Sequence, residues 1–201
     1  MRSAPQTVGI VAIGVSTGGP AALSKLIPEL SKDFSGSDRH RSAHAAGFYP
    51  HVGGAAPARG NGVKVVEGVD GMILEPGTAY IAPGNYHMAV RQKEGRSFLA
   101  MNQEPPVNYC RPSVDVLFRS VAEVYREETL GIIMTGMGQD GLNGIRAMKS
   151  KGAIIFAQDQ ASSVVWGMPS FVVREGLADC VLPLDEMKGA IEDCVMKRIK
   201  R

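Results

Sequence analysis

The stretch Val8–Pro20, VGIVAIGVSTGGP, decides the fold: an apolar run ends in a turn of small residues and leads into a helical pattern. A short run of Val, Ile and Ala bounded by Gly is typical of a strand buried on both faces of a parallel sheet. Pro20 suits the first turn of a helix, where its missing N–H needs no partner. Apolar residues then recur at helical spacing, at Leu23, Leu26, Ile27 and Leu30. The stretch therefore predicts a strand, a tight turn and a helix.

Ser16 falls at the carboxyl end of this strand and the amino end of this helix. Open α/β sheets bind ligands at that edge, and free backbone N–H groups there favour negative charge. The position suits a nucleophile, but a structural Ser that caps the helix is an equally open interpretation. A phosphate-binding loop is a third one, although neither G-x-G-x-x-G nor G-x-x-x-x-G-K-[ST] is present.

Length and composition limit the classes of protein to which this chain can belong. The 201 residues fit one α/β domain, and 22 Lys and Arg against 20 Asp and Glu give a formal charge of +2. Bulk electrostatics therefore predict neither nucleic acid nor membrane as a partner. Without a membrane-length apolar run or a signal peptide, we expect a cytoplasmic protein. The cysteines predict neither a disulfide framework nor a zinc site, because Cys110, Cys180 and Cys194 are widely spaced.

Further along, apolar runs alternate with helical patterns. Strands are predicted at 63–67, 78–82, 131–135, 153–157 and 179–182, helices from 112, around 142–148, over 168–174 and over 184–199, and a hairpin over 88–101. This alternation predicts a doubly wound, mostly parallel α/β sheet flanked by helices, with a small antiparallel hairpin. The loops Gly14–Gly19 and Gly136–Gly141 then share one sheet edge, and they carry Ser16 and Asp140.

Residues 37–60 fit this pattern worst. They show no apolar periodicity where an alternating α/β chain should have its next strand. An irregular segment of more than twenty residues is unusual in a compact domain.

Five motifs occur in order along the chain: Gly14–Gly19, Tyr80–Met88, Arg111–Asp115, Met134–Gly141 and Gly167–Pro169. Together they resemble the catalytic domain of the chemotaxis protein-glutamate methylesterases (CheB), apart from about residues 37–60. The resemblance implies a single catalytic domain over residues 1–201. Members of that family usually carry an amino-terminal receiver domain, for which this chain has no room. Control by phosphorylation would then be absent or would come from a separate regulator.

The resemblance implies hydrolysis of glutamyl methyl esters, and deamidation of some glutamines, on the cytoplasmic helices of chemoreceptors. Ser16 would be the nucleophile, and Asp140 would orient the imidazole that takes its proton. The backbone N–H groups of Thr17 and Met137 would face the oxyanion. This chemistry needs no metal and no organic cofactor, and the expected partner is a methylated receptor, with no nucleic acid and no membrane insertion.

The general base is the residue that matches least well. In the family a His follows a buried strand, in a motif Gln-His-Met-Pro-Pro, and counting from the nucleophile places it at Ala43. His44 is the adjacent candidate, with His40 and His51 nearby, although a lone His in a polar run is more often a solvated surface residue. His87 matches another family His, and we expect it near the substrate or packed in the hairpin.

A paired frameshift would explain the mismatch, and we state it as a hypothesis. Permitted codons for Ser37 through Ala58, read one nucleotide later, can spell Pro-Ile-Val-Ile-Val-Gln-His-Met-Pro-Pro and a helix after it. The polar segment as given cannot replace a buried apolar strand, because its charged residues cannot enter a core without partners. We therefore expect the chain as given to pack loosely or aggregate, and its triad to be incomplete.

Three functions remain open from the sequence. The first is an active methylesterase, and the second is a catalytically defective homologue that still docks on chemoreceptor helices. The third is a nucleotide-binding α/β domain. Methanol release from methylated receptors separates the first two, and a nucleotide-induced thermal shift identifies the third.

Overall fold

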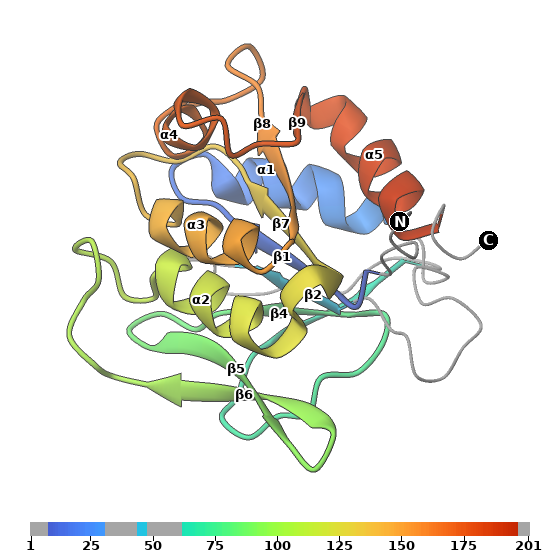
Figure 1. Ribbon diagram of the computed structural model, residues 1–201, viewed down its shortest axis with the longest axis vertical. Coiled ribbons are helices and arrows are strands. Elements are labelled where there is room, and N and C mark those ends of the chain that lie inside the picture. The colour runs from blue at the N-terminus through green and yellow to red at the C-terminus, as the bar shows by residue number, and fades with distance from the viewer. Residues whose placement is uncertain (1–7, 31–43, 48–61, 197–201) are drawn as a thin grey trace.

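A seven-stranded sheet forms the centre of the computed structural model in Figure 1, which describes residues 8–30, 44–47 and 62–196. The strand order is β3-β4-β2-β1-β7-β8-β9, and every neighbouring pair is parallel. A separate antiparallel hairpin pairs β5 with β6. The predicted fold class is confirmed. The strands are β1 Ile10–Gly14, β2 His44–Gly47, β3 Lys64–Glu67, β4 Thr78–Ile81, β5 His87–Lys93, β6 Arg96–Asn102, β7 Thr129–Ile133, β8 Ile154–Gln158 and β9 Cys180–Leu182.

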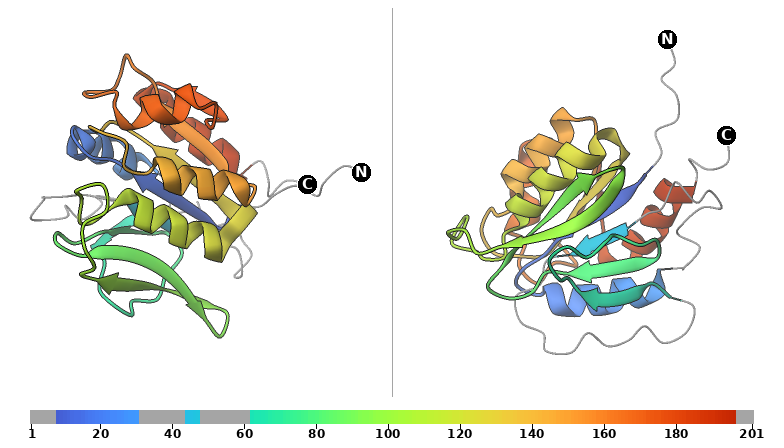
Figure 2. Two further views of the ribbon diagram at one scale, coloured as in Figure 1. Left: turned by 60° about the vertical axis from the view of Figure 1, so that its left-hand side comes forward. Right: turned by 90° about the horizontal axis from the view of Figure 1, so that it is seen from below.

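Helices cover both faces of the sheet, as the two views of Figure 2 show. The α-helices are α1 Gly19–Leu26, α2 Val114–Tyr125, α3 Leu142–Ser150, α4 Met168–Arg174 and α5 Leu184–Met196. Helices α1 and α5 pack into one hydrophobic core, while α2, α3, α4 and the hairpin pack into the other. In the described part of the chain, no helix is long and apolar enough to cross a membrane.

Strand β1 is apolar throughout because it contributes to both cores. Its side chains alternate between the two faces, so Ile10 and Ala12 join the core with α2, while Val11 and Ile13 join the core with α1. All five residues of β1 are buried. The apolar run that opens the chain is therefore the central strand of a sheet with two covered faces.

The expectation of an unbroken irregular segment over residues 37–60 is wrong, because strand β2 lies within it. Residues His44–Gly47 pair in parallel with β1 on one side and with β4 on the other, and so occupy the position of the missing strand. Strand pairing uses backbone N–H and C=O groups, so a short segment can pair without an apolar pattern. The rest of the segment, including Ala43, lies outside the described residues. The structure therefore does not test the frameshift hypothesis.

Element ends differ slightly from the predictions. Strand β7 begins at Thr129, two residues before the predicted start, and helix α2 begins at Val114, two residues after its predicted start at Pro112. Helix α5 is described to Met196, and its three predicted residues beyond that point lie outside the described residues. These shifts leave the loops after β1 and β7 at the same sheet edge.

Candidate active site

Ser16 lies two residues beyond β1, in the turn that leads to α1. Its backbone N–H donates to Thr135 O at 3.0 Å, and its carbonyl accepts from Gly19 N at 2.7 Å. The turn is tight because Gly18 adopts a left-handed φ of 81°, which glycine tolerates without strain. Ser16 is half-buried and Thr17 is exposed, so the hydroxyl sits at the surface on a fixed backbone.

The loop after β7 comes into direct contact with Ser16. A Cβ placed on Gly136 would lie 2.9 Å from Ser16 Cβ and would collide with the sulfur of Met168. The carbonyl of Gly136 accepts from Met168 N at 2.9 Å, at the start of α4. Segments after β1, β7 and β8 therefore meet around Ser16, and only glycine fits at position 136.

Two backbone N–H groups near Ser16 are unused. Within the described part of the chain, neither Thr17 N–H nor Met137 N–H has a hydrogen-bond acceptor. The Met137 residue is 75% exposed, and Thr17 is exposed as well. These are the two donors that the family resemblance implies for the oxyanion.

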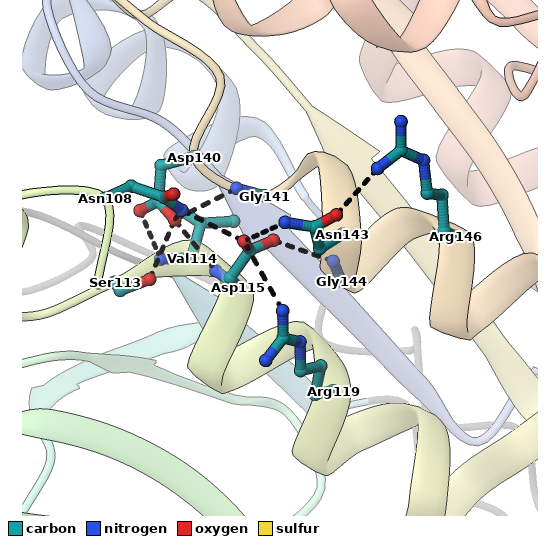
Figure 3. Close-up of polar contacts among 10 residues, drawn as sticks. All are labelled: Asn108, Ser113, Val114, Asp115, Arg119, Asp140, Gly141, Asn143, Gly144 and Arg146. Atoms are coloured by element: carbon teal, nitrogen blue, oxygen red, sulfur yellow. Dashed lines mark hydrogen bonds and ion pairs between the residues drawn. The ribbon is translucent and has the colours of Figure 1, made fainter.

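Asp140 lies at the same sheet edge as Ser16, in the loop between β7 and α3, but its surroundings are different. Its residue is only 6% exposed, and its carboxylate is surrounded by donors (Figure 3). The five donors are Ser113 Oγ and Val114 N at 2.7 Å, Asn108 Nδ2 at 2.8 Å, Gly141 N at 3.1 Å and Asp115 N at 3.2 Å. No imidazole is among these donors.

Asp140 and Asp115 cap each other's helices. Asp140, which precedes α3, accepts from the first N–H groups of α2, and Asp115, in the first turn of α2, accepts from Gly144 N of α3 at 2.7 Å. Asn108 Nδ2 lies between them, because it also donates to Asp115 Oδ2 at 2.9 Å. Carboxylates at helix amino ends are favourable, so this reciprocal arrangement fastens α2 to α3.

Asn108 is the site residue that sequence reasoning missed. It adopts a left-handed φ of 51° in the loop before α2, a conformation in which Asn is enriched. Its contact with Asp140 spans 32 positions of the chain. Only the family motif at Arg111–Asp115, a few residues later, signals that this region of the chain approaches the site.

His87 is buried at the start of β5 and is not a base for Ser16. Its Nδ1 accepts from Ser113 N at 3.2 Å, and its Nε2 lies 3.2 Å from Pro105 O, to which the Nε2 proton is directed. Both ring nitrogens are used, and the residue is 1% exposed. As expected from the sequence, it packs at the hairpin.

The register of the sheet separates His44 from Ser16. His44 begins β2 and pairs with Ile10 at the start of β1, whereas Ser16 follows Gly14 at the end of β1. The four residue steps from Ile10 to Gly14 span about 13 Å along the strand. The backbone of His44 therefore lies at the amino ends of the strands, and that of Ser16 lies at their carboxyl ends. The structure thus brings Ser16 and Asp140 to one edge and does not bring His44 to them. Ala43, His40 and His51 lie outside the described residues.

The donor chemistry of the described residues does not point to a metal. Among them, no three His, Cys, Asp or Glu side chains gather in a group that could hold a metal ion. The buried carboxylates of Asp115 and Asp140 are instead bridged by the Asn108 amide.

A serine at the carboxyl edge of a parallel sheet, beside open backbone N–H groups, gives this α/β protein the arrangement that serine hydrolases use. The particular family follows from comparison: the model of the CheB methylesterase family matches residues 11–191, and the chain belongs to that family. In the solved catalytic domain of the Thermotoga maritima CheB methylesterase, 33% of aligned residues are identical and the TM-score is 0.81. That match covers 93% of this chain and 98% of the solved one.

Two curated relatives carry the name protein-glutamate methylesterase/protein-glutamine glutaminase. The protein of Maricaulis maris is 44% identical over 182 residues, which are 90% of this chain and 45% of the relative. The protein of Trichodesmium erythraeum is 43% identical over 182 residues, which are 90% of this chain and 51% of the relative. The chain therefore spans about half the length of the curated relatives it matches.

Proposed function

We propose that this chain hydrolyses glutamyl methyl esters, and deamidates glutamines, on the cytoplasmic helices of chemoreceptors, with Ser16 as the nucleophile. The observation that carries the proposal is the placement of Ser16 against Gly136, with the N–H groups of Thr17 and Met137 open beside it. The names of the curated relatives support the same reaction. The protein would act in the cytoplasm, with methylated chemoreceptors and a separate regulator as its partners.

The reaction would be acyl transfer in two steps. Ser16 Oγ adds to the ester carbonyl, its proton passes through a base to the departing methoxide, and methanol leaves an acyl-serine. Water then adds to the acyl-serine and returns the proton to Ser16, which releases the glutamate side chain. In both steps the oxyanion would accept from Thr17 N–H and Met137 N–H, each worth about 2.7–4 kcal/mol in the transition state.

A second candidate is a defective homologue, and the site itself favours it. Ala43 stands where the family motif has its His, and among the described residues no imidazole reaches Ser16 or donates to Asp140. Ser16 and the open N–H groups alone would give only weak catalysis. Such a protein would dock on the receptor and turn over slowly.

Methanol release from methylated receptor membranes tests the two candidates. We would compare the chain as given, its Ser16→Ala variant, and a version with the alternative frame restored over Ser37–Gly60. Release that needs Ser16 in the chain as given supports the methylesterase. Release only from the restored version supports the defective homologue, and release from neither would contradict the proposed reaction.

A further inference from the structure

Thr135 connects the three segments that meet at Ser16. It follows β7 by two residues and is 1% exposed. Its N–H donates to Gln158 Oε1 of β8 at 2.9 Å, and its carbonyl accepts from Ser16 N at 3.0 Å. Its hydroxyl donates to Thr17 O at 2.9 Å and accepts from Val165 N at 3.0 Å, with Val165 O a longer alternative acceptor at 3.3 Å. Every polar atom of Thr135 is therefore engaged.

These contacts fix the backbone on both sides of Thr17. The carbonyl before it, on Ser16, accepts from Gly19 N at 2.7 Å, and its own carbonyl accepts from the Thr135 hydroxyl. In a trans peptide the N–H points opposite to the C=O. With the Ser16 carbonyl directed at Gly19, the Thr17 N–H is directed away from the helix and stays open.

Side chains close the space around the Thr135 hydroxyl. A Cβ on Gly18 would lie 3.1 Å from Thr135 Oγ1 and 2.7 Å from Val164 Cβ. Because the hydroxyl is enclosed, removing it would leave the Thr17 carbonyl and the Val165 N–H without a partner. The turn would then lose the contact that orients it.

We propose that Thr135 is a positioning residue that aims the Thr17 N–H at the oxyanion formed on Ser16. A role for Thr135 in catalysis rests on the proposed function. The positioning itself applies to any tetrahedral adduct formed on Ser16 and can be tested without the receptor reaction. It predicts that the hydroxyl of Thr135, and not its bulk, determines how tightly such an adduct is held.

Thr129 offers a matched control on the same strand. It is the first residue of β7, is fully buried, and its Oγ1 has no hydrogen-bond partner among the described residues. Thr129→Val removes a buried hydroxyl at the amino end of β7, just as Thr135→Val removes one beyond its carboxyl end. Only the second change touches the turn at Ser16.

The test is the affinity of the full chain for butylboronic acid, which forms a tetrahedral adduct with a serine hydroxyl, measured by boron NMR. We expect Ser16→Ala to abolish the tetrahedral signal. Thr135→Val should raise the dissociation constant at least tenfold, whereas Thr129→Val should change it less than twofold. The pair Thr135→Ser and Thr135→Ala isolates the hydroxyl if the Val variant fails to fold: Ser should bind within threefold of the parent, and Ala should bind as weakly as Val.

A second measurement separates positioning from a general loss of structure. With 4-nitrophenyl acetate, Thr135→Val and Thr135→Ala should lower kcat and leave KM nearly unchanged, and Thr135→Ser should restore kcat. The inference is overturned if the Ala and Ser variants bind the boronate equally, if Thr129→Val weakens binding as much as Thr135→Val, or if no adduct depends on Ser16. Boronate binding that depends on Thr135, without methanol release from receptors, would contradict the proposed reaction and leave this inference standing.

Discussion

The loops that carry Ser16 and Asp140 follow neighbouring parallel strands, precede helices and lie at one sheet edge, yet their polar groups are used in opposite ways. In the Ser16 loop, the hydroxyl of Ser16 and the N–H of Thr17 have no partner within the described part of the chain, and the Met137 N–H at the start of the Asp140 loop is open beside them. In the Asp140 loop, five donors surround one carboxylate. The groups around Ser16 are open to a ligand, whereas the carboxylate of Asp140 already holds together the segments around it.

This difference shows that sharing an edge does not by itself make a triad. An ionised carboxylate offers about four lone-pair directions, two on each oxygen. In Asp140, Oδ1 accepts from Asn108, Ser113, Asp115 and Gly141, and Oδ2 accepts from Val114. An imidazole N–H would have to approach Oδ2, which accepts only from Val114 N and keeps one lone pair, because Oδ1 already accepts from four donors. Asp140 works first as the cap that joins α2 to α3.

Ser16→Ala should have the largest effect on activity and the smallest on folding. The hydroxyl makes no hydrogen bond among the described residues, so its loss removes the nucleophile and leaves the packing intact. We expect Ser16-dependent ester hydrolysis to vanish while the melting temperature stays within about 2 °C, since each kcal/mol shifts it by roughly 2–4 °C in a domain of this size. Hydrolysis that persists in the variant would mean that another group is the nucleophile.

Ser113→Ala makes the same change in a residue that contacts the other loop, and here the stability of the protein should respond instead of its activity. The Ser113 hydroxyl donates to Asp140 at 2.7 Å in a buried position. Its loss should lower the free energy of unfolding by about 1–3 kcal/mol, measured by urea denaturation. A variant as stable as the parent would show that the network around Asp140 tolerates the loss of a donor.

Asp140→Ala should destabilise the fold more than any other single change in these two loops. It leaves five donors without their acceptor and removes the cap of α2. We expect a loss of at least about 3 kcal/mol of unfolding free energy, a large part of the 5–15 kcal/mol typical of a domain. Asp140→Asn keeps one acceptor oxygen and should fall between Ala and the parent. If both variants melt like the parent, the carboxylate is free to serve an imidazole and the contrast between the loops fails.

Much of this architecture is readable from the sequence because burial leaves a pattern. β1 is apolar along its whole length since both of its faces are covered, and the turn after it needs small residues to bring the chain into α1. β2 leaves no such pattern, because its four residues, His-Ala-Ala-Gly, are held by backbone pairing with β1 and β4. Backbone pairing is nearly independent of side-chain type, so periodicity cannot detect it.

Only part of the candidate site could be predicted from the sequence, for a similar reason. Ser16 and Asp140 lie in loops at strand ends, where topology alone brings them to one edge. Four of the five donors of Asp140 come from Asn108 and from the start of α2, more than twenty positions earlier in the chain. No local signal records a contact of that range, so the structural use of Asp140 was not foreseen.

Gly167→Ala tests whether the open N–H groups depend on exact backbone placement. Gly167 has φ −84°, which any residue adopts, but a Cβ there would lie 2.6 Å from Gly136 O and 3.2 Å from Met137 Cα. The loop must move, and we expect kcat for 4-nitrophenyl acetate to fall about tenfold or more. Gly138→Ala is the matched control, because it meets nothing within 4 Å and costs only the strain of φ +81°, about 1–2 kcal/mol. Equal loss of kcat in both variants would mean that loop stability, not the position of Met137, limits the rate.

The smallest expected effect concerns Cys110, which reports on the charge of Asp140. Burial raises the pKa of the Cys110 thiol, and the negative charge of Asp140 raises it further. A raised pKa leaves less thiolate at pH 8, so iodoacetamide should label Cys110 more slowly than the exposed Cys180. Asp140→Asn removes the charge but not the burial, so labelling of Cys110, measured well below the melting temperature, should speed up only a fewfold, while Cys180 stays unchanged as the internal control. If the Asn variant labels no faster than the parent, the charge of Asp140 does not act on the Cys110 thiol and this prediction is wrong.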